Sequence, residues 1–354
     1  MIFKPGGLAT GIGSLPYTKP EPALELIKKN IPVIPHWPQL PRLGGQEGFV
    51  YQFLNPLVDM RLLVQDKKKV YFDTNAPDWA ERLTEFYMSY FAAVEGDEET
   101  LNRFAFPETS AVGFYAFMEN MSKDPGEASY VKGHLAGPLT IGFQLTDAGG
   151  KLAYYQEQLR DLLVKTLALH ARWQAVTLGK LGLPVIIFLD EPGIRIYGQS
   201  SYITVTREMI LEDIGAIFEA IHAGGAMAGV HSCDAIDWTF LFESELEIIS
   251  FDSYTYFKSF LPFTTGLRDF LKRGGSLAWG IVPTSAKVWE ESEDSLFKLL
   301  TLQWDELGKK GISQELLLRQ ALITPACGTG LLTFDEAERI YTLTRQIGKR
   351  CRNC

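Results

Sequence analysis

Hydrophobic positions along the chain follow two alternating patterns. Short runs of apolar and β-branched residues are each followed by a turn and then by a segment whose apolar residues recur three and four positions apart. The first pattern predicts buried strands and the second predicts helices, so their alternation is typical of β/α units. The predicted core strands are residues 8–12, 32–35, 130–135, 185–189, 226–230, 248–251, 276–280 and 322–324.

Helical patterns fill several of the intervals between these strands. The clearest are residues 149–182, 206–223, 293–310 and 333–349. The last segment begins with Thr333 and carries Glu336 three residues later, which is the spacing of a capping box. Strands alternating with helices favour an α/β fold of the (β/α)8 TIM-barrel type. A doubly wound sheet with an appendage is the alternative that periodicity leaves open.

Residues 39–128 are too many for a plain connection between the second and third predicted strands. Within them, VQDKKKVYFDTN predicts part of a small hairpin, and residues 76–96 and 108–123 predict extra helices. Long loops with their own secondary structure commonly carry function. We therefore expect an elaborated insertion that acts as a lid, within a single barrel domain spanning residues 1–354.

Composition and charge narrow the class of protein. The 354 residues include 34 Lys and Arg against 43 Asp and Glu, a net charge of −9, so we expect neither a nucleic acid nor an anionic membrane surface as partner. The N-terminus lacks the features of a signal peptide, and no apolar run reaches the roughly 18 residues of a membrane span. A cytoplasmic protein that acts on a small molecule is predicted.

The chain has four cysteines, Cys233, Cys327, Cys351 and Cys354. In a reducing compartment such sparse thiols are more typical of metal ligands, nucleophiles or free side chains than of disulfides. The last two form a CxxC in the basic end GKRCRNC, for which we expect a mobile tail. Because no second pair lies nearby, free thiols are the favoured interpretation there.

Metal-binding residue types follow three of the predicted strands. His231 and Cys233 come after the fifth strand, Asp252 after the sixth and Cys327 after the eighth. The carboxyl ends of barrel strands surround one pocket, so these side chains are expected to converge. Each residue alone also fits a buried core position. Together, one imidazole, two thiolates and one carboxylate suit a tetrahedral zinc ion.

The charge of this ligand set indicates the chemistry. Two thiolates already offset the +2 charge of zinc, and a carboxylate would make the site negative, so the metal would polarise a carbonyl poorly. Such a zinc ion instead favours a bound substrate thiol, which it deprotonates at neutral pH while the sulfur stays nucleophilic. The predicted reaction is transfer of an alkyl group to sulfur.

Two further motifs offer polar groups at strand ends. Asp190 and Glu191 are adjacent, so their side chains point to opposite faces of the strand and only one faces the pocket. We expect Asp190 to recognise a substrate ammonium and Glu191 to support the loop; the alternative is a salt bridge with Arg195 or another neighbour. TGIGSLP lacks the spacing of a phosphate loop, but its glycines allow close approach of a ligand and Ser14 can form a hydrogen bond.

These residues carry a family resemblance. GIGSLP, VKGHLAGPLTI, FLDEP, HSC, IISFDSY and TPACG occur in this order and resemble the catalytic barrel of cobalamin-independent methionine synthase, over about residues 10–345. The wider superfamily includes uroporphyrinogen decarboxylase. The resemblance implies zinc held by His231, Cys233 and Cys327, with Asp252 standing where the family carries a glutamate ligand.

The same resemblance implies homocysteine as the substrate. It would be bound through Asp190, the catalytic and substrate-binding carboxylate, and through the turn from Ile12 to Ser14; Glu47 matches a further amino-acid-binding glutamate. The thiol of homocysteine would complete the zinc shell and attack a methyl group.

The methyl-donor side departs from the family pattern. Residues 142–144, GFQ, stand where the family has an aromatic residue associated with folate, and GIVPTS lacks a histidine found near that strand end. The pattern resembles short single-barrel members, called core methionine synthases, which take methyl from a methylated corrinoid protein. A methylated corrinoid is therefore the expected donor, with methyl-tetrahydrofolate second.

Three other functions remain open at the level of sequence. One is another zinc-dependent thiol methyltransferase of the coenzyme M or methoxy-compound type, whose sulfonate acceptor would want a cation in place of Asp190. A second is a decarboxylase of the uroporphyrinogen type, which would want arginines over the pocket, where only Arg42 and Arg195 are candidates. The third is a non-catalytic carrier of a corrinoid or a metal.

Overall fold

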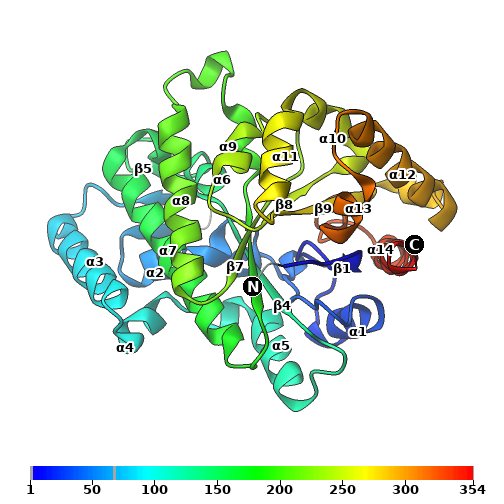
Figure 1. The fold of residues 1–354 in the computed structure, drawn as a ribbon. Coiled ribbons are helices and arrows are strands. Elements are labelled where there is room, and N and C mark those ends of the chain that lie inside the picture. Colours follow the sequence, from blue (N-terminus) through cyan, green and yellow to red (C-terminus); the bar gives the residue numbers. More distant parts are fainter. Residues whose placement is uncertain (1–2, 67–68, 354) are drawn as a thin grey trace.

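The computed structural model describes residues 3–66 and 69–353. It has an α/β fold around a parallel, strongly curled sheet, consistent with a TIM-barrel-like fold (Figure 1). Seven strands pair in the order β1-β10-β9-β8-β7-β6-β4, and every neighbouring pair is parallel. Their bounds are β1 (Leu8–Ala9), β4 (Val131–Ala136), β6 (Val185–Asp190), β7 (Met227–Ser232), β8 (Ile248–Phe251), β9 (Ser276–Val282) and β10 (Ala321–Pro325).

The predicted strand at residues 32–35 is not formed, which corrects the expectation of eight regular strands. Pro32 and Pro35 have no N–H to donate, so a continuous ladder cannot run through this segment. Carbonyl groups of this segment still accept hydrogen bonds from the chain at and just before β4. Val33 O accepts from Tyr130 N, and Pro35 O accepts from Lys132 N at 2.9 Å.

This irregular segment lies between the two edge strands of the sheet. On one side His36 forms a parallel bridge with Lys132 of β4, and on the other Gln39 forms a parallel bridge with Ser14, beyond β1. The sheet is thus hydrogen-bonded at both edges to the same stretch of chain. Because the strands are parallel and the sheet curls, the carboxyl ends of its strands lie around one common region.

Helices lie around the outside of the sheet (Figure 1). The predicted helices 206–223, 293–310 and 333–349 are confirmed in α8, α12 and α14, whereas the helix expected from residue 149 begins later, at Glu157. Thr333 and Glu336 form the predicted capping box. The bounds are α1 (Pro20–Asn30), α6 (Pro138–Gly142), α7 (Glu157–Gly179), α8 (Arg207–Ala223), α9 (Thr239–Glu243), α10 (Ser253–Phe260), α11 (Thr264–Lys272), α12 (Glu293–Lys309), α13 (Gln314–Arg319) and α14 (Phe334–Arg352).

The two faces of the strands pack differently. Residues such as Ile187 and Leu189 of β6 join the large apolar cluster under the helices. Ile186 and Phe188 join a smaller cluster with residues of β8, β9 and β10 on the inner face. Since side chains alternate along a strand, Asp190 continues the inner row of Phe188 at the carboxyl end. The strand period therefore decides which polar residues reach the interior.

The insertion at residues 39–128 contains the predicted hairpin and helices. Strands β2 (Leu63–Asp66) and β3 (Lys69–Phe72) pair antiparallel, and β5 (Thr146–Asp147) adds to β3; residues 67–68 of the hairpin turn lie outside the described part. The helices are α2 (Asn55–Asp59), α3 (Trp79–Val94), α4 (Glu98–Leu101) and α5 (Val112–Lys123). The lid role of this insertion stays a prediction.

The C-terminal segment corrects a sequence-based expectation. Helix α14 continues to Arg352, so most of the predicted mobile tail is helical. No glycine or proline interrupts the sequence after Gly348, so the helix continues through Cys351. The side chain of Cys351 is buried in the core. Its CxxC partner, Cys354, lies outside the described residues.

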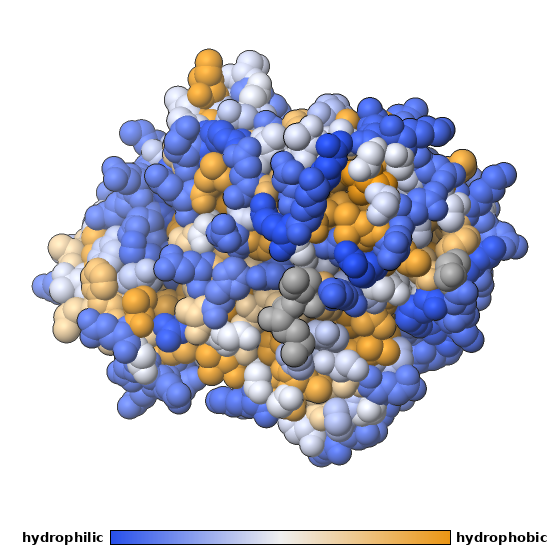
Figure 2. Space-filling model, in the orientation of Figure 1, coloured by the Kyte–Doolittle hydropathy of each residue, from blue (hydrophilic) through white to orange (hydrophobic). Residues whose placement is uncertain are grey.

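The outer surface is mostly hydrophilic on the face shown in Figure 2. Hydrophilic residues cover much of the face shown in Figure 2, with apolar residues scattered among them. Within the described residues, no helix is long and apolar enough to cross a membrane.

Candidate metal centre

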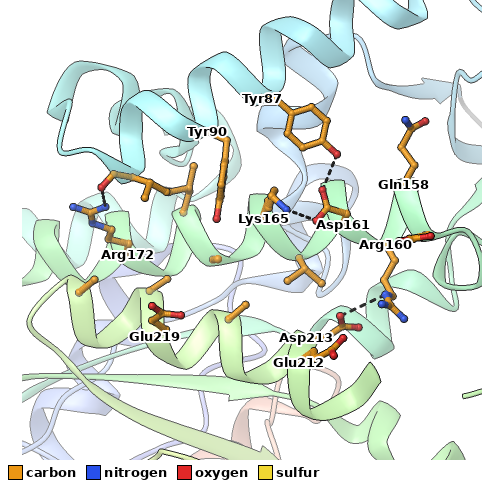
Figure 3. A pocket seen from close by; sticks show the side chains of 18 residues that line it. Tyr87, Tyr90, Gln158, Arg160, Asp161, Lys165, Arg172, Glu212, Asp213 and Glu219 are labelled. Carbon is orange, nitrogen blue, oxygen red and sulfur yellow. Dashed lines mark hydrogen bonds and ion pairs between the residues drawn. The ribbon is translucent and has the colours of Figure 1, made fainter. Parts of the chain in front are cut away.

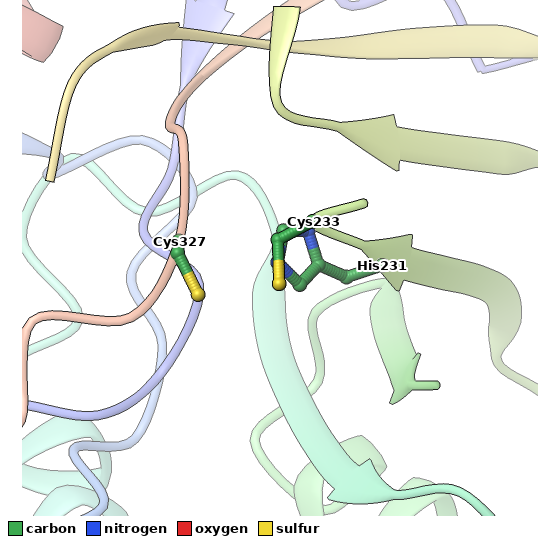
Figure 4. A group of neighbouring side chains, drawn as sticks. All are labelled: His231, Cys233 and Cys327. Atoms are coloured by element: carbon green, nitrogen blue, oxygen red, sulfur yellow. The ribbon is translucent and has the colours of Figure 1, made fainter. Parts of the chain in front are cut away.

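Three of the four predicted metal ligands meet at the carboxyl ends of the strands (Figure 4). His231 lies in β7, Cys233 follows that strand, and Cys327 follows β10. One potential ligand atom from each residue lies within 4.8 Å of those of the other two. These side chains could hold a metal ion such as zinc.

Local sequence explains the convergence. His231 and Cys233 are two positions apart, so both side chains project from the same face of the chain as it leaves β7. The register of β10 with β9 shifts between Thr324 and Pro325, and such an irregularity redirects the chain that follows. Cys327 lies just beyond this shift and turns back toward the end of β7 (Figure 4).

The imidazole of His231 is oriented by a neighbouring strand. Its Nδ1 lies 3.0 Å from the hydroxyl oxygen of Ser250 in β8, and its Nε2 is buried with no hydrogen-bond partner among the described residues. When Nδ1 carries the proton and donates to Ser250, the Nε2 lone pair is free. This is the arrangement of a metal-binding histidine with a supporting partner.

The pKa values of the two thiols are shifted in opposite directions. A hydrogen bond from the Cys327 thiol, together with the nearby His231, lowers the pKa of Cys233 to about 4. The same pairing, with burial, raises the pKa of Cys327 above its ordinary value. Burial alone would lower the pKa of His231, but the Cys233 thiolate raises it. These shifts favour deprotonation of Cys233 over Cys327, and thiols must be deprotonated to bind a divalent cation.

Asp252, the fourth predicted ligand, is not brought into this group. Its Oδ1 accepts a hydrogen bond from Thr255 N at 2.8 Å and so caps the N-terminus of α10. Burial raises the pKa of its carboxyl, and the charge of Cys233 acts in the same direction. Asp252 is therefore close enough to act electrostatically, while metal coordination by it stays a prediction.

Asp190 ends β6 and is paired in register with His231. It is 5% exposed, and its Oδ1 has no hydrogen-bond partner among the described residues. Burial raises the pKa of its carboxyl to about 6, although His231 and Lys132 act to lower it. The alternative ion pair with Arg195 is not formed, because Arg195 pairs with Asp234 at 3.2 Å. A buried carboxylate with an unpartnered oxygen is thus present beside His231, Cys233 and Cys327, which we call the metal group.

Glu191 points the other way, as the strand alternation predicts. Its carboxylate accepts hydrogen bonds from Leu139 N at 2.8 Å, Thr140 N at 2.9 Å and Gly193 N at 3.0 Å. Burial raises the pKa of this carboxyl to about 7 against those hydrogen bonds. Glu191 therefore supports the loops after β4 and β6.

Ser14 holds the loop that carries Cys327. Its carbonyl oxygen accepts hydrogen bonds from Thr329 N and Thr329 Oγ1, both at 3.0 Å, and its hydroxyl accepts from Gly330 N at 3.2 Å. A Cβ on Gly328 would lie 2.3 Å from Ser14 Oγ, so this close approach requires glycine. The turn after β1 and the loop after β10 are thus held together beside the metal group.

Ile12 and Glu47 take other positions. The carbonyl oxygen of Ile12 accepts a hydrogen bond from Lys132 Nζ at 2.6 Å. Glu47 is buried outside the metal group; its Oε1 accepts from Val112 N at 2.8 Å and its Oε2 from Gln52 at 3.1 Å. Burial raises the pKa of Glu47 to about 7. The substrate-binding roles predicted for both residues stay predictions.

Three polar residues of the interior were missed by sequence reasoning. They are Lys132 and His134 of β4, both fully or almost fully buried, and Ser250 of β8. A signal was present in VKGHLAG, where Lys132 and His134 are two apart and hence share a face of an otherwise apolar strand. A lysine inside a buried strand is rare enough to mark a polar interior.

A hollow of about 710 Å³ lies away from these residues, over α7 and between α3 and α8 (Figure 3). Its charged groups are largely paired with each other. Asp161 accepts from Tyr87 and pairs with Lys165, and Arg160 pairs with Asp213 at 3.5 Å. It contains none of the predicted site residues.

Comparisons with known proteins yield only distant likenesses. No sequence family and no curated protein matches the chain. A solved structure of a B12-independent methionine synthase from Shewanella sp. W3-18-1, bound to selenomethionine, is similar at 15% identity and a TM-score of 0.47, over 67% of each chain. A pneumococcal exo-β-D-N-acetylglucosaminidase module is similar at 9% identity and a TM-score of 0.47, over 97% of this chain and 83% of that one. These values identify neither a family nor a reaction.

Proposed function

We propose that the protein is a zinc-dependent methyltransferase that transfers a methyl group to the thiol of homocysteine, forming methionine, with a methylated corrinoid as donor. The observation that carries the proposal is the meeting of His231, Cys233 and Cys327 beside the unpartnered carboxylate oxygen of Asp190. The first three residues would hold zinc, and Asp190 would receive the ammonium of the amino acid.

The donor set fits the metal. One imidazole nitrogen and two thiolates are ligands that zinc prefers, and a zinc ion held by these three residues would act as a Lewis acid toward a substrate thiol. The buried, unpartnered Nε2 of His231 would supply the nitrogen. Zinc bound there would lower the pKa of an acceptor thiol while leaving its sulfur nucleophilic.

Other residues of the chain would support the metal ligands and orient the acceptor. Ser250 holds the His231 ring, and Ser14 holds the loop of Cys327, so both metal-binding positions are supported. Asp190, in register with His231, would orient the acceptor by its ammonium. As the new bond between sulfur and methyl forms, the bond from methyl to the donor breaks and its electron pair stays on the donor.

The donor is proposed from the sequence resemblance, in which the homocysteine side of the family pattern is retained better than the folate side. Heterolytic transfer from methylcobalamin needs no proton on the leaving corrinoid. Transfer from methyl-tetrahydrofolate needs a proton on the leaving nitrogen, and GIVPTS lacks the histidine of the family at that strand end.

The test is a methionine-formation assay on the zinc-loaded protein with homocysteine and either methylcobalamin or methyl-tetrahydrofolate. We expect methionine with methylcobalamin, and loss of activity in Cys327→Ser. Cys351→Ala, which changes a buried thiol of α14 outside the metal group, is the matched control and should stay active. Absence of methionine with both donors would overturn the proposed reaction.

A further inference from the structure

Two of the three cysteines that the structure describes form a close pair. The sulfur atoms of Cys233 and Cys327 lie within 4.8 Å of each other and point into the same space (Figure 4). Both side chains are partly exposed, whereas Cys351 is buried in α14 and does not belong to the metal group. Small molecules from the solvent can therefore reach the pair.

A disulfide between these two cysteines needs only a small movement. Disulfide sulfurs are about 2.0 Å apart, so those of Cys233 and Cys327 would have to approach each other by less than about 3 Å. A change of one cysteine side chain from one staggered rotamer to the next moves its sulfur by roughly that distance. The backbone can therefore stay in place.

The segment that bears Cys327 is held on both sides. Before it, Ala326 N donates a hydrogen bond to the Val282 carbonyl at 2.8 Å. After it, Thr329 N donates to the Ser14 carbonyl at 3.0 Å. Because the folded chain keeps the two thiols near each other, each is present at a high effective concentration for the other. Pairing within the chain is therefore favoured over reaction of each thiol with a separate small molecule.

We propose that Cys233 and Cys327 form a reversible disulfide on reaction with a low-molecular-weight disulfide, and that this bond and a metal ion exclude each other. Partly exposed disulfides are the readily reduced, regulatory kind. Formation of the disulfide does not depend on the proposed function. Its effect on catalysis does rest on that function.

The reaction is a thiol–disulfide exchange in two steps. In the first, the sulfur of one cysteine bonds to one sulfur of the small disulfide, whose S–S bond breaks to release one small thiol. In the second, the sulfur of the other cysteine bonds to that of the first, and the second small thiol leaves. The two protein thiols are oxidised and the small disulfide is reduced. The two protons of the protein thiols end on the two released thiols.

Oxidation would remove two of the three side chains of the metal group at once. The thiolate is the form of cysteine that binds a metal, and a sulfur in a disulfide is no longer a thiolate. Only His231 would remain, and one imidazole does not hold a zinc ion, which takes at least three protein ligands in its usual sites. Conversely, a metal bound to both sulfurs would block the exchange. An oxidant would therefore switch the centre off.

The test uses the full-length double variant Cys351→Ala, Cys354→Ala, in which Cys233 and Cys327 are the remaining cysteines. Metal-free protein is treated with oxidised glutathione, digested with trypsin without reduction and analysed by mass spectrometry. We expect peptides 208–258 and 320–339, which contain one cysteine each, to be joined. Wild type, analysed in the same way, should give the same joined pair, so the result does not depend on how well the double variant folds.

Metal binding is measured on the same samples. Cobalt, followed by the absorption of its thiolate complex, should not bind to the cross-linked protein and should bind again after reduction with dithiothreitol. Zinc-loaded protein should form the cross-link roughly tenfold or more slowly than metal-free protein. Cys233→Ser and Cys327→Ser, made in the same double variant, are matched controls; each should carry one glutathione in place of a cross-link.

The outcomes separate this inference from the proposed function. Glutathione on both cysteines without a cross-link, no reaction at all, or unchanged cobalt binding by the cross-linked protein would overturn the inference. Equal rates of cross-linking with and without zinc would overturn the exclusion of the disulfide by the metal. A cross-link that forms as expected, in a protein that makes no methionine when reduced and zinc-loaded, would overturn the proposed function alone.

Discussion

The sulfur atoms of Cys233 and Cys327 lie within 4.8 Å of each other, although one follows β7 and the other follows β10 (Figure 4). The two strands are separated in the sheet by β8 and β9. The loop bearing Cys327 must therefore reach across the open end of the curled sheet, and Ser14 holds it there. If both thiols are deprotonated, their charges repel at this distance, and a shared cation would remove that repulsion.

Metal content should depend on this pair. We expect about one zinc per wild-type chain, and a large loss of zinc in Cys327→Ser and in Cys233→Ser, because structural and catalytic zinc sites need deprotonated sulfur or nitrogen ligands. Elemental analysis of the purified proteins measures this directly. Cys351→Ala should keep its zinc; full zinc in Cys327→Ser would contradict the ligand assignment.

Asp252 can be tested separately from the cysteines. Asparagine is also a good helix cap, so Asp252→Asn should preserve both the cap on α10 and the zinc, whereas Asp252→Ala should lower the free energy of unfolding by about 1 kcal/mol. Urea denaturation and zinc analysis of both variants give the two quantities. A folded Asp252→Asn protein that loses zinc would instead show that this carboxylate coordinates the metal.

Gly13 should not accept a side chain. In Gly13→Ala the added Cβ would lie within 2.7 Å of three atoms of the buried His134 ring, so we expect a loss of about 1–3 kcal/mol in unfolding free energy. Gly215→Ala in α8 is the matched control. Its Cβ meets nothing within 4 Å, and it should be stabilised by about 0.5–1 kcal/mol.

A second substitution checks the cause of that loss. If the clash with the ring destabilises Gly13→Ala, adding His134→Ala should restore part of the stability, since the space is then available. Additive losses in the double variant would show that the strain arises elsewhere in the turn.

Buried neutral histidines should make the protein sensitive to acid. Burial lowers the pKa of His170 from 6.5 to about 4, against its hydrogen bond to the Phe104 carbonyl. The unfolded chain takes up this proton first, so the contribution of His170 to stability is present above pH 6.5 and is lost as the pH falls toward 4. His36, with its pKa lowered to about 3, acts in the same direction.

The variant His170→Asn isolates this effect. Asparagine can donate a hydrogen bond like that of Nδ1 but does not titrate, so the fall in Tm between pH 7 and pH 5 should be shallower than in wild type. Thermal unfolding monitored by circular dichroism at both pH values measures the slopes. Equal slopes would mean that His170 does not titrate as its burial requires.

Much of the local structure follows from the sequence because strands and helices have fixed side-chain periods. The predicted strand 248–251 is confirmed to the residue in β8, and Thr333 and Glu336 form the predicted capping box. The alternation rule also separated Asp190 from Glu191 correctly, since the latter turns away to the loops after β4 and β6. These results depend only on near neighbours in the chain.

Two predictions made from local sequence patterns, the strand at residues 32–35 and the mobile C-terminal tail, were wrong. The apolar run at residues 32–35 resembles a strand, but two missing N–H groups leave it irregular. The basic end of the chain resembles a tail, yet Cys351 finds a place in the core and the helix continues. The two prolines are visible in the sequence, whereas the burial of Cys351 depends on the segments that pack against α14.

The sequence by itself determined the α/β alternation and the placing of His231, Cys233 and Cys327 at the carboxyl ends of their strands. Tertiary structure alone decided that these three approach within 4.8 Å of one another and that Asp252 caps α10. It also placed the buried charge of Lys132 beside the proposed substrate site. The reason is that side-chain period is a local property of the backbone, whereas distances across the interior depend on how the whole sheet curls.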